Sequence, residues 1–175
     1  MRHGETEWNA LGKIQGGNLD LSLNETGRAQ AQKIEETVFN LGIKKILHSP
    51  LRRAKETADI VNKRSALPMH TFDDFKEWNV GDWYGLSSDV FRSYVKQGLQ
   101  PPNGETLSAF KHRVHDAFDR LVKDHNNFLI VAHGFTFNAL KSKSNIQTNI
   151  ESLSNCQFVE FEYFDNHFWR ATEYG

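Results

Sequence analysis

The sequence feature that most restricts the fold is a continuous apolar run at 128–132, bounded by Asn127 and Gly134. A strand with one solvated face alternates polar and apolar residues, whereas a parallel-sheet strand is covered on both faces and is apolar throughout. Shorter apolar runs at 43–48 and 69–72 are further candidate strands. Parallel strands need long crossovers, usually helices that cover the sheet. The sequence therefore predicts an α/β fold of three layers, with a mostly parallel central sheet flanked by helices.

Helical patterns fill the segments between the candidate strands. Asn24 is a candidate N-cap, and the apolar residues after it recur at helical spacing, which predicts a helix at 25–41. The glycine-rich residues before it are predicted to form an ordered loop. Two aromatic-rich stretches near the C-terminus are predicted to pair as a hairpin that turns at Asp165-Asn166. Further helices are predicted at three places: after residue 50, from 104 to about 121, and from 135 to about 143.

The chain length suits one domain, and we predict a single domain over 1–175. The segment 73–104 is irregular and rich in Trp, Gly and Pro, with one short helical pattern. We predict that this segment forms a short helical lid beside a binding site.

Charge and cysteine content restrict the partners and the compartment. Lysine and arginine number 21 and aspartate and glutamate 22, and this balance argues against bulk binding to nucleic acid or to an anionic membrane. No apolar run approaches the roughly 20 residues of a membrane span. The single cysteine, Cys156, cannot form an intramolecular disulfide, which favours a reducing compartment. We expect a cytoplasmic protein without a signal peptide that binds neither nucleic acid nor membrane, and whose C-terminal hairpin offers an edge for a possible homodimer.

Basic residues gather where the predicted strands end. Ligands of open α/β sheets bind at the carboxyl ends of the strands, and 2–4, 49–53 and 132–134 lie at or just after such ends. Guanidinium forks match a phosphate group, and a neutral imidazole nitrogen can attack phosphorus. The residue types alone therefore predict a site for phosphate chemistry.

Arg2-His3-Gly4-Glu5-Thr6 resembles the signature of the histidine phosphatase superfamily, also called the phosphoglycerate-mutase-like family. Further similar stretches follow in the family's order along nearly the whole chain, and such an ordered set is far more specific than one tripeptide. They are Trp8-Asn9, Gln15-Gly16, the run from Ser49 to Ala58, Glu77 before Gly81-Asp82-Trp83, Gly104-Glu105-Thr106, and Val131-Ala132-His133-Gly134.

The resemblance implies a phosphomonoesterase acting on a small phosphorylated metabolite. His3 would attack the phosphoryl group and become phosphohistidine, while Glu77 would protonate the leaving oxygen and then assist a water. The resemblance implies no metal and no organic cofactor. It assigns phosphate binding to Arg2, Arg53 and His133, and substrate contacts to Asn9, Gln15, Gly16 and the amide of Gly134.

Two of these assignments have competitors nearby in the sequence. Arg52 adjoins Arg53, and the spacing from Ser49 in the family's motif favours Arg53. The carboxylates near Glu77 that remain alternatives as the proton donor are Asp73, Asp74 and Asp82.

Three other functions remain open at this stage. A phosphoglycerate-type mutase would use the same chemistry. Mutases of the family carry a long insertion between the acid and the second histidine, whereas the segment from Glu77 to His133 is short, which favours hydrolysis. A metal-dependent hydrolase with His3, His133 and Glu77 as ligands is disfavoured by the positive charges of Arg2 and Arg53. A non-catalytic phosphate-binding relative is disfavoured because every catalytic residue type is present.

The sequence departs from the family at its start. In the family the signature follows a buried strand of several apolar residues, whereas here only Met1 precedes Arg2. We therefore expect the first strand to be missing from the given sequence, and without that strand we expect His3 to lie on an unanchored chain end.

Overall fold

A parallel sheet of three strands forms the centre of the structure. The computed structural model describes residues 1–124, 127–164 and 168–173. In it β1 (Lys45–His48) lies between β2 (Met69–Thr71) and β3 (Phe128–Val131), and both neighbours run parallel to it. The three predicted strands are therefore present, and the parallel pairing is confirmed.

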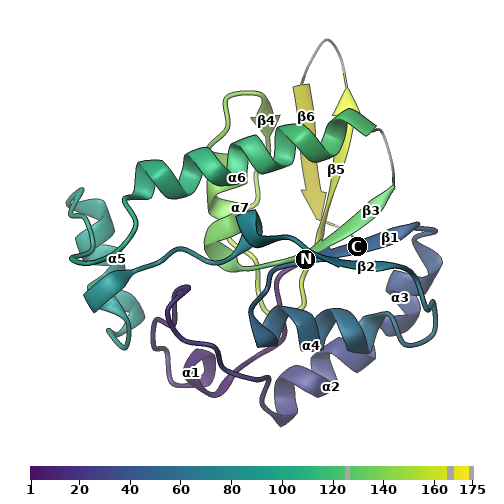
Figure 1. The fold of residues 1–175 in the computed structure, drawn as a ribbon, viewed down its shortest axis with the longest axis horizontal. Coiled ribbons are helices and arrows are strands. Elements are labelled where there is room, and N and C mark those ends of the chain that lie inside the picture. The colour runs from purple at the N-terminus through teal and green to yellow at the C-terminus, as the bar shows by residue number, and fades with distance from the viewer. Residues whose placement is uncertain (125–126, 165–167, 174–175) are drawn as a thin grey trace.

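Helices cover both faces of this sheet, as Figure 1 shows. The predicted α/β architecture, with a sheet flanked by helices, is confirmed. One face carries α2 (Glu25–Lys33), α3 (Glu35–Asn40) and α4 (Arg52–Val61), and the other carries α6 (Leu107–Leu121) and α7 (Gly134–Lys141).

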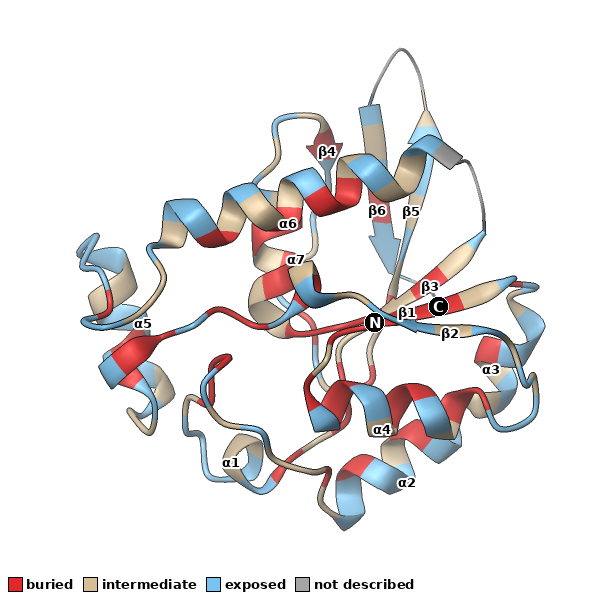
Figure 2. Ribbon diagram, in the orientation of Figure 1, coloured by how far each residue is buried: buried red, intermediate tan, exposed pale blue. Residues whose placement is uncertain are grey.

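The apolar run at 128–132 is buried between the two helical layers. Leu129 and Val131 belong to one buried cluster, whereas Ala132 belongs to a second and Ile130 packs against it. Successive side chains of a strand point to opposite faces, so this alternation shows that both faces are covered. Figure 2 shows the matching pattern on α6, whose buried positions face the sheet.

A second sheet holds the C-terminal hairpin. Its strand order is β4 (Ile146–Gln147), β6 (Phe168–Glu173) and β5 (Val159–Phe164), with β5 and β6 antiparallel. The pairing confirms the predicted hairpin, and its predicted turn at Asp165-Asn166 lies outside the described residues. β4 was not predicted, because two residues are too short to give a periodic pattern.

The first residues of the chain are held between the two sheets. The amide of His3 donates to the carbonyl of Ala132 at 3.0 Å, and the amide of Ala132 donates to the carbonyl of Met1 at 2.9 Å. On the other side the amide of Cys156 donates to the carbonyl of Arg2 at 3.1 Å. The expectation that His3 lies on an unanchored end is therefore wrong, because main-chain hydrogen bonds to segments far along the chain hold it on both sides.

Two predicted segments differ from the structure in detail. The helix expected at 25–41 is interrupted at Ile34, which leaves helical geometry with ψ near 1°. The interruption divides it into α2 and α3, and buried Ala31 and Val38 of these two helices pack in one cluster. The segment expected to be a loop before residue 24 contains the short helix α1 (Glu7–Ala10).

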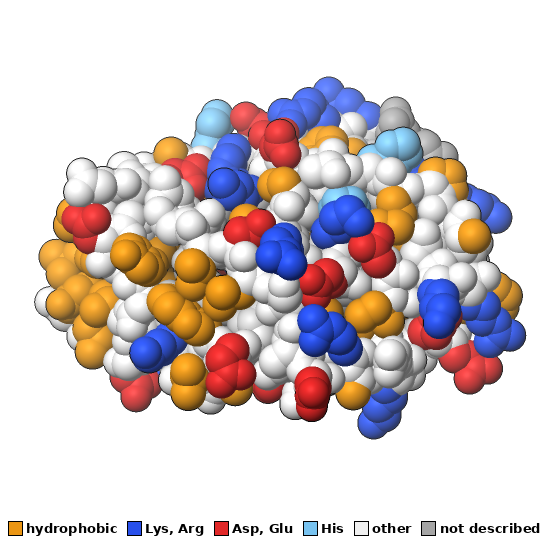
Figure 3. Space-filling model, turned by 60° about the horizontal axis from the view of Figure 1, so that its bottom comes forward, with side chains coloured by type: hydrophobic (Ala, Val, Ile, Leu, Met, Phe, Trp, Pro, Cys, Tyr) orange, Lys and Arg blue, Asp and Glu red, His pale blue; other side chains and the backbone are white. Residues whose placement is uncertain are grey.

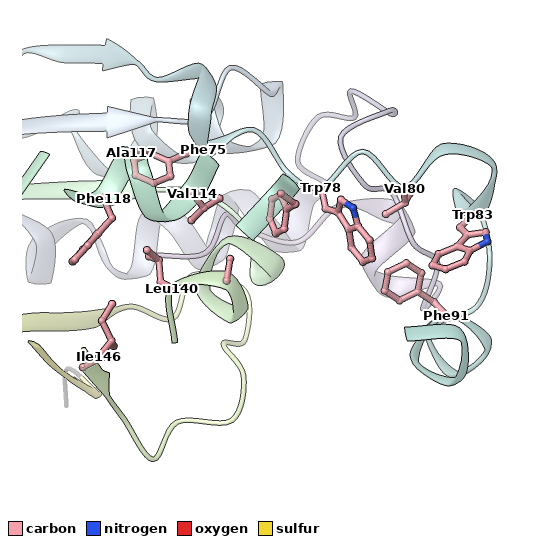
Figure 4. Close-up of a cluster of buried hydrophobic side chains, with 14 residues drawn as sticks. Phe75, Trp78, Val80, Trp83, Phe91, Val114, Ala117, Phe118, Leu140 and Ile146 are labelled. Atoms are coloured by element: carbon pink, nitrogen blue, oxygen red, sulfur yellow. The ribbon is translucent and has the colours of Figure 1, made fainter. Parts of the chain in front are cut away.

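The predicted lid segment contains little regular structure. Two 3₁₀ turns, η1 (Asp73–Phe75) and η2 (Gly81–Trp83), precede α5 (Ser88–Lys96), and a third, η3 (Val122–Asp124), follows α6. Figure 4 shows buried aromatic side chains from this segment, Trp78, Trp83 and Phe91, continuing the cluster formed by α6 and α7. The segment is therefore packed on the core rather than held apart from it.

The surface mixes charges of both signs. On the face seen in Figure 3, hydrophobic side chains gather at the end that holds α1 and α5, and charged side chains are interspersed over the rest. Within the described ranges, no helix has the length and apolar character needed to cross a membrane.

Candidate active site

His3 lies at the carboxyl end of the parallel sheet, beside the end of β3. Its Nδ1 is 2.6 Å from the carbonyl oxygen of Gly4, so Nδ1 carries the proton and Nε2 carries the lone pair. Only 3% of the residue is exposed. Burial, then the charges of Arg53 and Arg2, hold the pKa of His3 well below 6.5. The imidazole is therefore neutral, as a nitrogen nucleophile must be.

Arg53 projects from the first turn of α4 and contacts His3 directly. Its Nε donates to Nε2 of His3 at 3.2 Å, and its two Nη atoms donate to the carbonyls of Leu19 and Gly16, each at 2.9 Å. Burial lowers the pKa of Arg53 to about 10, so the guanidinium remains charged at neutral pH. Arg52, its neighbour, is exposed and lies 4.0 Å from Glu56.

Arg2 provides the second positive charge. Its Nη1 donates to the carbonyl of Leu153 at 2.7 Å, whereas its buried Nε has no hydrogen-bond partner among the described residues. The structure thus brings two guanidinium groups to the ring of His3, as phosphate binding requires.

His133 packs against His3 and is held by a serine. The ring centroids of His3 and His133 are 5.2 Å apart, and Nε2 of His133 lies 2.7 Å from Oγ of Ser49. Its buried Nδ1 has no hydrogen-bond partner within the described ranges. Burial, followed by the charge of Arg53, holds the pKa of His133 well below 6.5.

Glu77 is the buried acid of the site. Its Oε1 accepts from the amide of Trp78 at 3.0 Å, and its Oε2 accepts from the amide of Phe135, in the first turn of α7, at 3.2 Å. Burial raises the pKa of this carboxyl above 4.5, against the opposing effects of the amides and of Arg53. A carboxyl with a raised pKa can hold a proton for transfer to a leaving group.

The predicted substrate-contacting residues lie on α1, on the loop after it and at the start of α7. Oδ1 of Asn9 accepts from the amide of Thr6 in a capping box that fixes α1. Nε2 of Gln15 donates to Oγ1 of Thr6 at 2.7 Å, and the buried Oε1 of Gln15 has no partner among the residues described. Gly16 has a positive φ of 59° and lies so close to Val80 that a Cβ would overlap it.

One cavity of about 600 Å³ collects these residues. His133 does not line it, although its ring packs edge-on against that of His3. Asp73, Asp74 and Asp82, the alternatives to Glu77, do not line it either. The predicted site residues that do line it are Arg2, His3, Asn9, Gln15, Gly16, Arg53, Glu77 and Gly134.

Several polar groups at the site were not identified from the sequence. Ser49 was noted only as part of a motif, yet its hydroxyl contacts His133. Nδ2 of Asn155 donates to the carbonyl of His3 at 3.0 Å and lies 3.3 Å from Oδ1 of Asn9. No local pattern marks Asn155, because it reaches the site from a loop more than 150 positions away in the sequence.

The described residues contain no group of three or more His, Cys, Asp or Glu side chains placed to hold a metal ion. The charged groups nearest the two histidines are instead the arginines described above.

Comparison with known proteins identifies relatives over the full length of the chain. A family model described as histidine phosphatase superfamily (branch 1) matches residues 1–174. The uncharacterized phosphatase PhoE of Bacillus subtilis is 35% identical over 100% of this chain and 92% of its own length. The phosphoglycerate mutase-like protein 4 of Arabidopsis thaliana is 31% identical over 100% of this chain and 83% of its own.

Solved structures with the same fold include two phosphatases. A putative α-ribazole-5′-phosphate phosphatase of Escherichia coli superimposes with a TM-score of 0.83 at 25% identity, over 99% of this chain and 92% of its own. A mycobacterial glucosyl-3-phosphoglycerate phosphatase superimposes with a TM-score of 0.81 at 25% identity, over 99% of this chain and 95% of its own.

Proposed function

This chain belongs to the histidine phosphatase superfamily, and from that premise we propose that it is a phosphomonoesterase acting through a phosphohistidine on His3. One observation carries the proposal. The lone pair of His3 Nε2 lies on a buried, neutral ring beside the guanidinium of Arg53, in a cavity that also contains Glu77. A nucleophile, a charge that stabilises phosphoryl oxygens and an acid are the three parts that phosphoryl transfer needs.

In the first step the lone pair of His3 Nε2 forms a bond to phosphorus. The bond between phosphorus and the leaving oxygen breaks, and that oxygen takes its electron pair together with the proton of Glu77. Arg2 and Arg53 stabilise the charge on the non-bridging oxygens during the transfer.

In the second step the carboxylate of Glu77 takes a proton from a water as the water oxygen attacks phosphorus. The N–P bond breaks, and its electron pair returns to Nε2 of His3. Inorganic phosphate leaves, and Glu77 is protonated again for the next turnover. One carboxyl serves both steps because the leaving oxygen departs on the side of phosphorus opposite His3, and the attacking water approaches from that same side.

The unpaired buried atoms around the cavity support a role in binding the phosphate. Nε of Arg2, a donor, and Oε1 of Gln15, an acceptor, have no partner in the described part of the chain, and both residues line the cavity. Burying such groups is costly unless a ligand completes their hydrogen bonds. Asn9, Gln15 and Gly16, together with the amide of Gly134, line the same cavity and are proposed to contact the substrate there.

The mutase is the second candidate, because relatives at 31–32% identity are named as mutase-like or as probable phosphoglycerate mutases. Incubation with 3-phosphoglycerate separates the two, since a phosphatase releases inorganic phosphate whereas a mutase produces the isomer faster than phosphate. We expect phosphate release.

A substrate panel tests the wider proposal. We expect the wild-type protein to release phosphate from phosphorylated metabolites at an unchanged rate in EDTA. The panel includes α-ribazole phosphate and glucosyl-3-phosphoglycerate, the substrates in the names of two structural relatives. Inhibition by EDTA would favour a metal-dependent hydrolase, and a folded protein without turnover on any substrate would favour a non-catalytic phosphate-binding protein.

A further inference from the structure

Glu77 lies on neither a helix nor a strand, so no regular secondary structure fixes its position. It follows the 3₁₀ turn η1 and precedes η2, in a stretch without regular hydrogen bonds. A general acid must stay within hydrogen-bond reach of the leaving oxygen. Some other part of the molecule must therefore fix the backbone that carries this carboxyl.

The side chain of Arg113, on α6, holds that backbone. Its Nη1 donates to the carbonyls of Asp74 and Lys76, at 2.7 and 2.8 Å, and its Nη2 lies 3.4 Å from the carbonyl of Glu77 itself. Three carbonyls of the stretch 74–77 thus accept hydrogen bonds from one guanidinium.

Glu105, just before α6, holds the guanidinium in place. Its Oε1 accepts from Nε of Arg113 at 2.8 Å, and its Oε2 accepts from Nη2 at 2.9 Å. The five contacts occupy every nitrogen of the fork, and the two side chains are only 25% and 18% exposed. A guanidinium bound to a carboxylate through two parallel hydrogen bonds is fixed in orientation as well as neutralised in charge. A lysine ammonium cannot form such a pair.

The backbone of Glu105 holds the other side of Glu77. Its carbonyl accepts from Nε1 of Trp78 at 2.7 Å, and its amide donates to the carbonyl of Asn79 at 2.8 Å. Figure 4 shows Trp78 within the buried aromatic cluster, so this side of the stretch is also anchored by packing. The backbone is therefore held on both sides of Glu77 along the chain: Arg113 contacts the carbonyls of 74–77, and the backbone of Glu105 contacts Trp78 and Asn79.

We propose that Arg113 is a positioning residue for Glu77: by holding the carbonyls of 74–77 it keeps the carboxyl where it can protonate the leaving oxygen. The inference rests on the proposed function. It assigns Arg113 no contact with substrate, since this residue does not line the cavity.

The test compares two substrates in the full-length protein. The nitrophenolate of p-nitrophenyl phosphate departs without a proton, whereas the alkoxide of glycerol phosphate needs one. The ratio kcat/KM covers the steps up to formation of the phosphohistidine and excludes the water step, in which Glu77 acts with every substrate. Arg113→Met should lower kcat/KM with glycerol phosphate by about tenfold or more, and kcat/KM with p-nitrophenyl phosphate by less than about threefold. Arg113→Lys and Glu105→Gln should show the same selectivity with smaller losses, and they serve if the methionine variant does not fold.

Arg120→Met is the matched control. Arg120 lies on the same helix and pairs with the carboxylate of Asp74, so its removal deletes a guanidinium near the segment without touching the carbonyls at 76 and 77. We expect no change of kcat/KM with either substrate. In a Glu77→Gln background, Arg113→Met should have no further effect, because a residue acting only through Glu77 cannot act once the acid is gone.

Equal losses of kcat/KM with both substrates, or additive effects with Glu77→Gln, would overturn the positioning role. If the wild type hydrolyses neither substrate, the proposed function fails separately, and NMR titration of the Glu77 carboxyl carbon decides the structural part. Burial keeps its pKa above 4.5 in the wild type. We expect Arg113→Met to bring the pKa of Glu77 back toward 4.5, and an unchanged pKa would contradict the positioning role of Arg113.

Discussion

Nε of Arg53 donates a hydrogen bond to Nε2 of His3 across 3.2 Å, so the buried guanidinium contacts the nitrogen whose lone pair is proposed to attack phosphorus. Nδ1 of His3 faces the carbonyl of Gly4 and carries the proton. The two contacts together fix the tautomer and the direction of the lone pair. The charge of Arg53 also disfavours protonation of the ring, which keeps the nucleophile available in mild acid.

Replacing Arg53 by lysine keeps the positive charge but removes the planar guanidinium, whose three nitrogens donate to His3, Leu19 and Gly16. We expect kcat/KM to fall by about 10²-fold, the usual loss when a group stabilising the transition state is removed. The carbonyls of Leu19 and Gly16 would lose their donors, at a cost of about 1–3 kcal/mol in the free energy of unfolding. Arg52→Lys is the control for steady-state kinetics and thermal unfolding, because Arg52 is exposed. Equal effects of the two substitutions would contradict the role of Arg53.

The pH profile of kcat/KM should have two limbs of defined origin. His3 must be neutral, and its pKa lies below 6.5, so activity should rise with pH through that lowered value. Glu77 must be protonated, and its pKa lies above 4.5, so activity should fall as pH rises through that raised value. The optimum is expected between these two pKa values, in steady-state assays over a pH series.

Glu77→Gln provides the control for this profile. The variant should lose the alkaline limb, because glutamine does not titrate, and should keep the acidic limb set by His3. An alkaline limb that survives unchanged would show that a different group is the acid.

Stability should fall in acid. The folded pKa values of His3 and His133 are depressed below 6.5, so their contribution is present above pH 6.5 and is lost as pH falls through the depressed values. Glu77, with its raised pKa, opposes this fall, whereas the Met1 amino group, whose pKa burial lowers to about 5, adds to it. Thermal unfolding should show Tm falling below pH 6.5, with a shallower fall in His133→Gln. An equally steep fall in that variant would contradict this origin.

Gly27→Ala tests the packing of α2 against the backbone of Gly4 and Glu5. A Cβ at Gly27 would lie 2.1 Å from the carbonyl oxygen of Glu5, and one at Gly4 would lie 2.5 Å from that of Gly27. Helix propensity favours alanine by about 1 kcal/mol. The overlap is with backbone, so we expect a net destabilisation of about 2 kcal/mol by denaturant unfolding. At Gly42, where a Cβ meets nothing within 4 Å, only the positive φ of 64° costs, about 1 kcal/mol. A Gly27→Ala variant more stable than the wild type would contradict the close approach.

The sequence was most informative where a residue pattern reflects one dominant force. The run at 128–132 predicted a strand buried on both faces because the hydrophobic effect acts at every position of it, and β3 has that burial. The convergence of the segments containing His3, Arg53 and Gly134 followed from the rule that strand ends share one edge of a parallel sheet.

Features that depend on contacts between distant segments could not be predicted. The interruption at Ile34 has no glycine or proline to mark it. Main-chain hydrogen bonds to Ala132 and Cys156 anchor the backbone of Arg2 and His3, and backbone groups leave no pattern in a sequence. The reach of Arg113 to the carbonyls of 74–77 depends on the path of that loop, which no periodicity determines.

The most direct measurement of the central claim is rapid quenching with a phosphate-labelled substrate, followed by location of the label on the protein. We expect an acid-labile, base-stable phosphoryl group on His3 of the wild type. Glu77→Gln, measured with p-nitrophenyl phosphate, should accumulate the same adduct, because the water then lacks its base. His3→Ala should carry no label, although it should still fold and bind inorganic phosphate. A wild-type enzyme that turns over without labelled His3, or a His3→Ala variant that retains the label and the activity, would contradict the account.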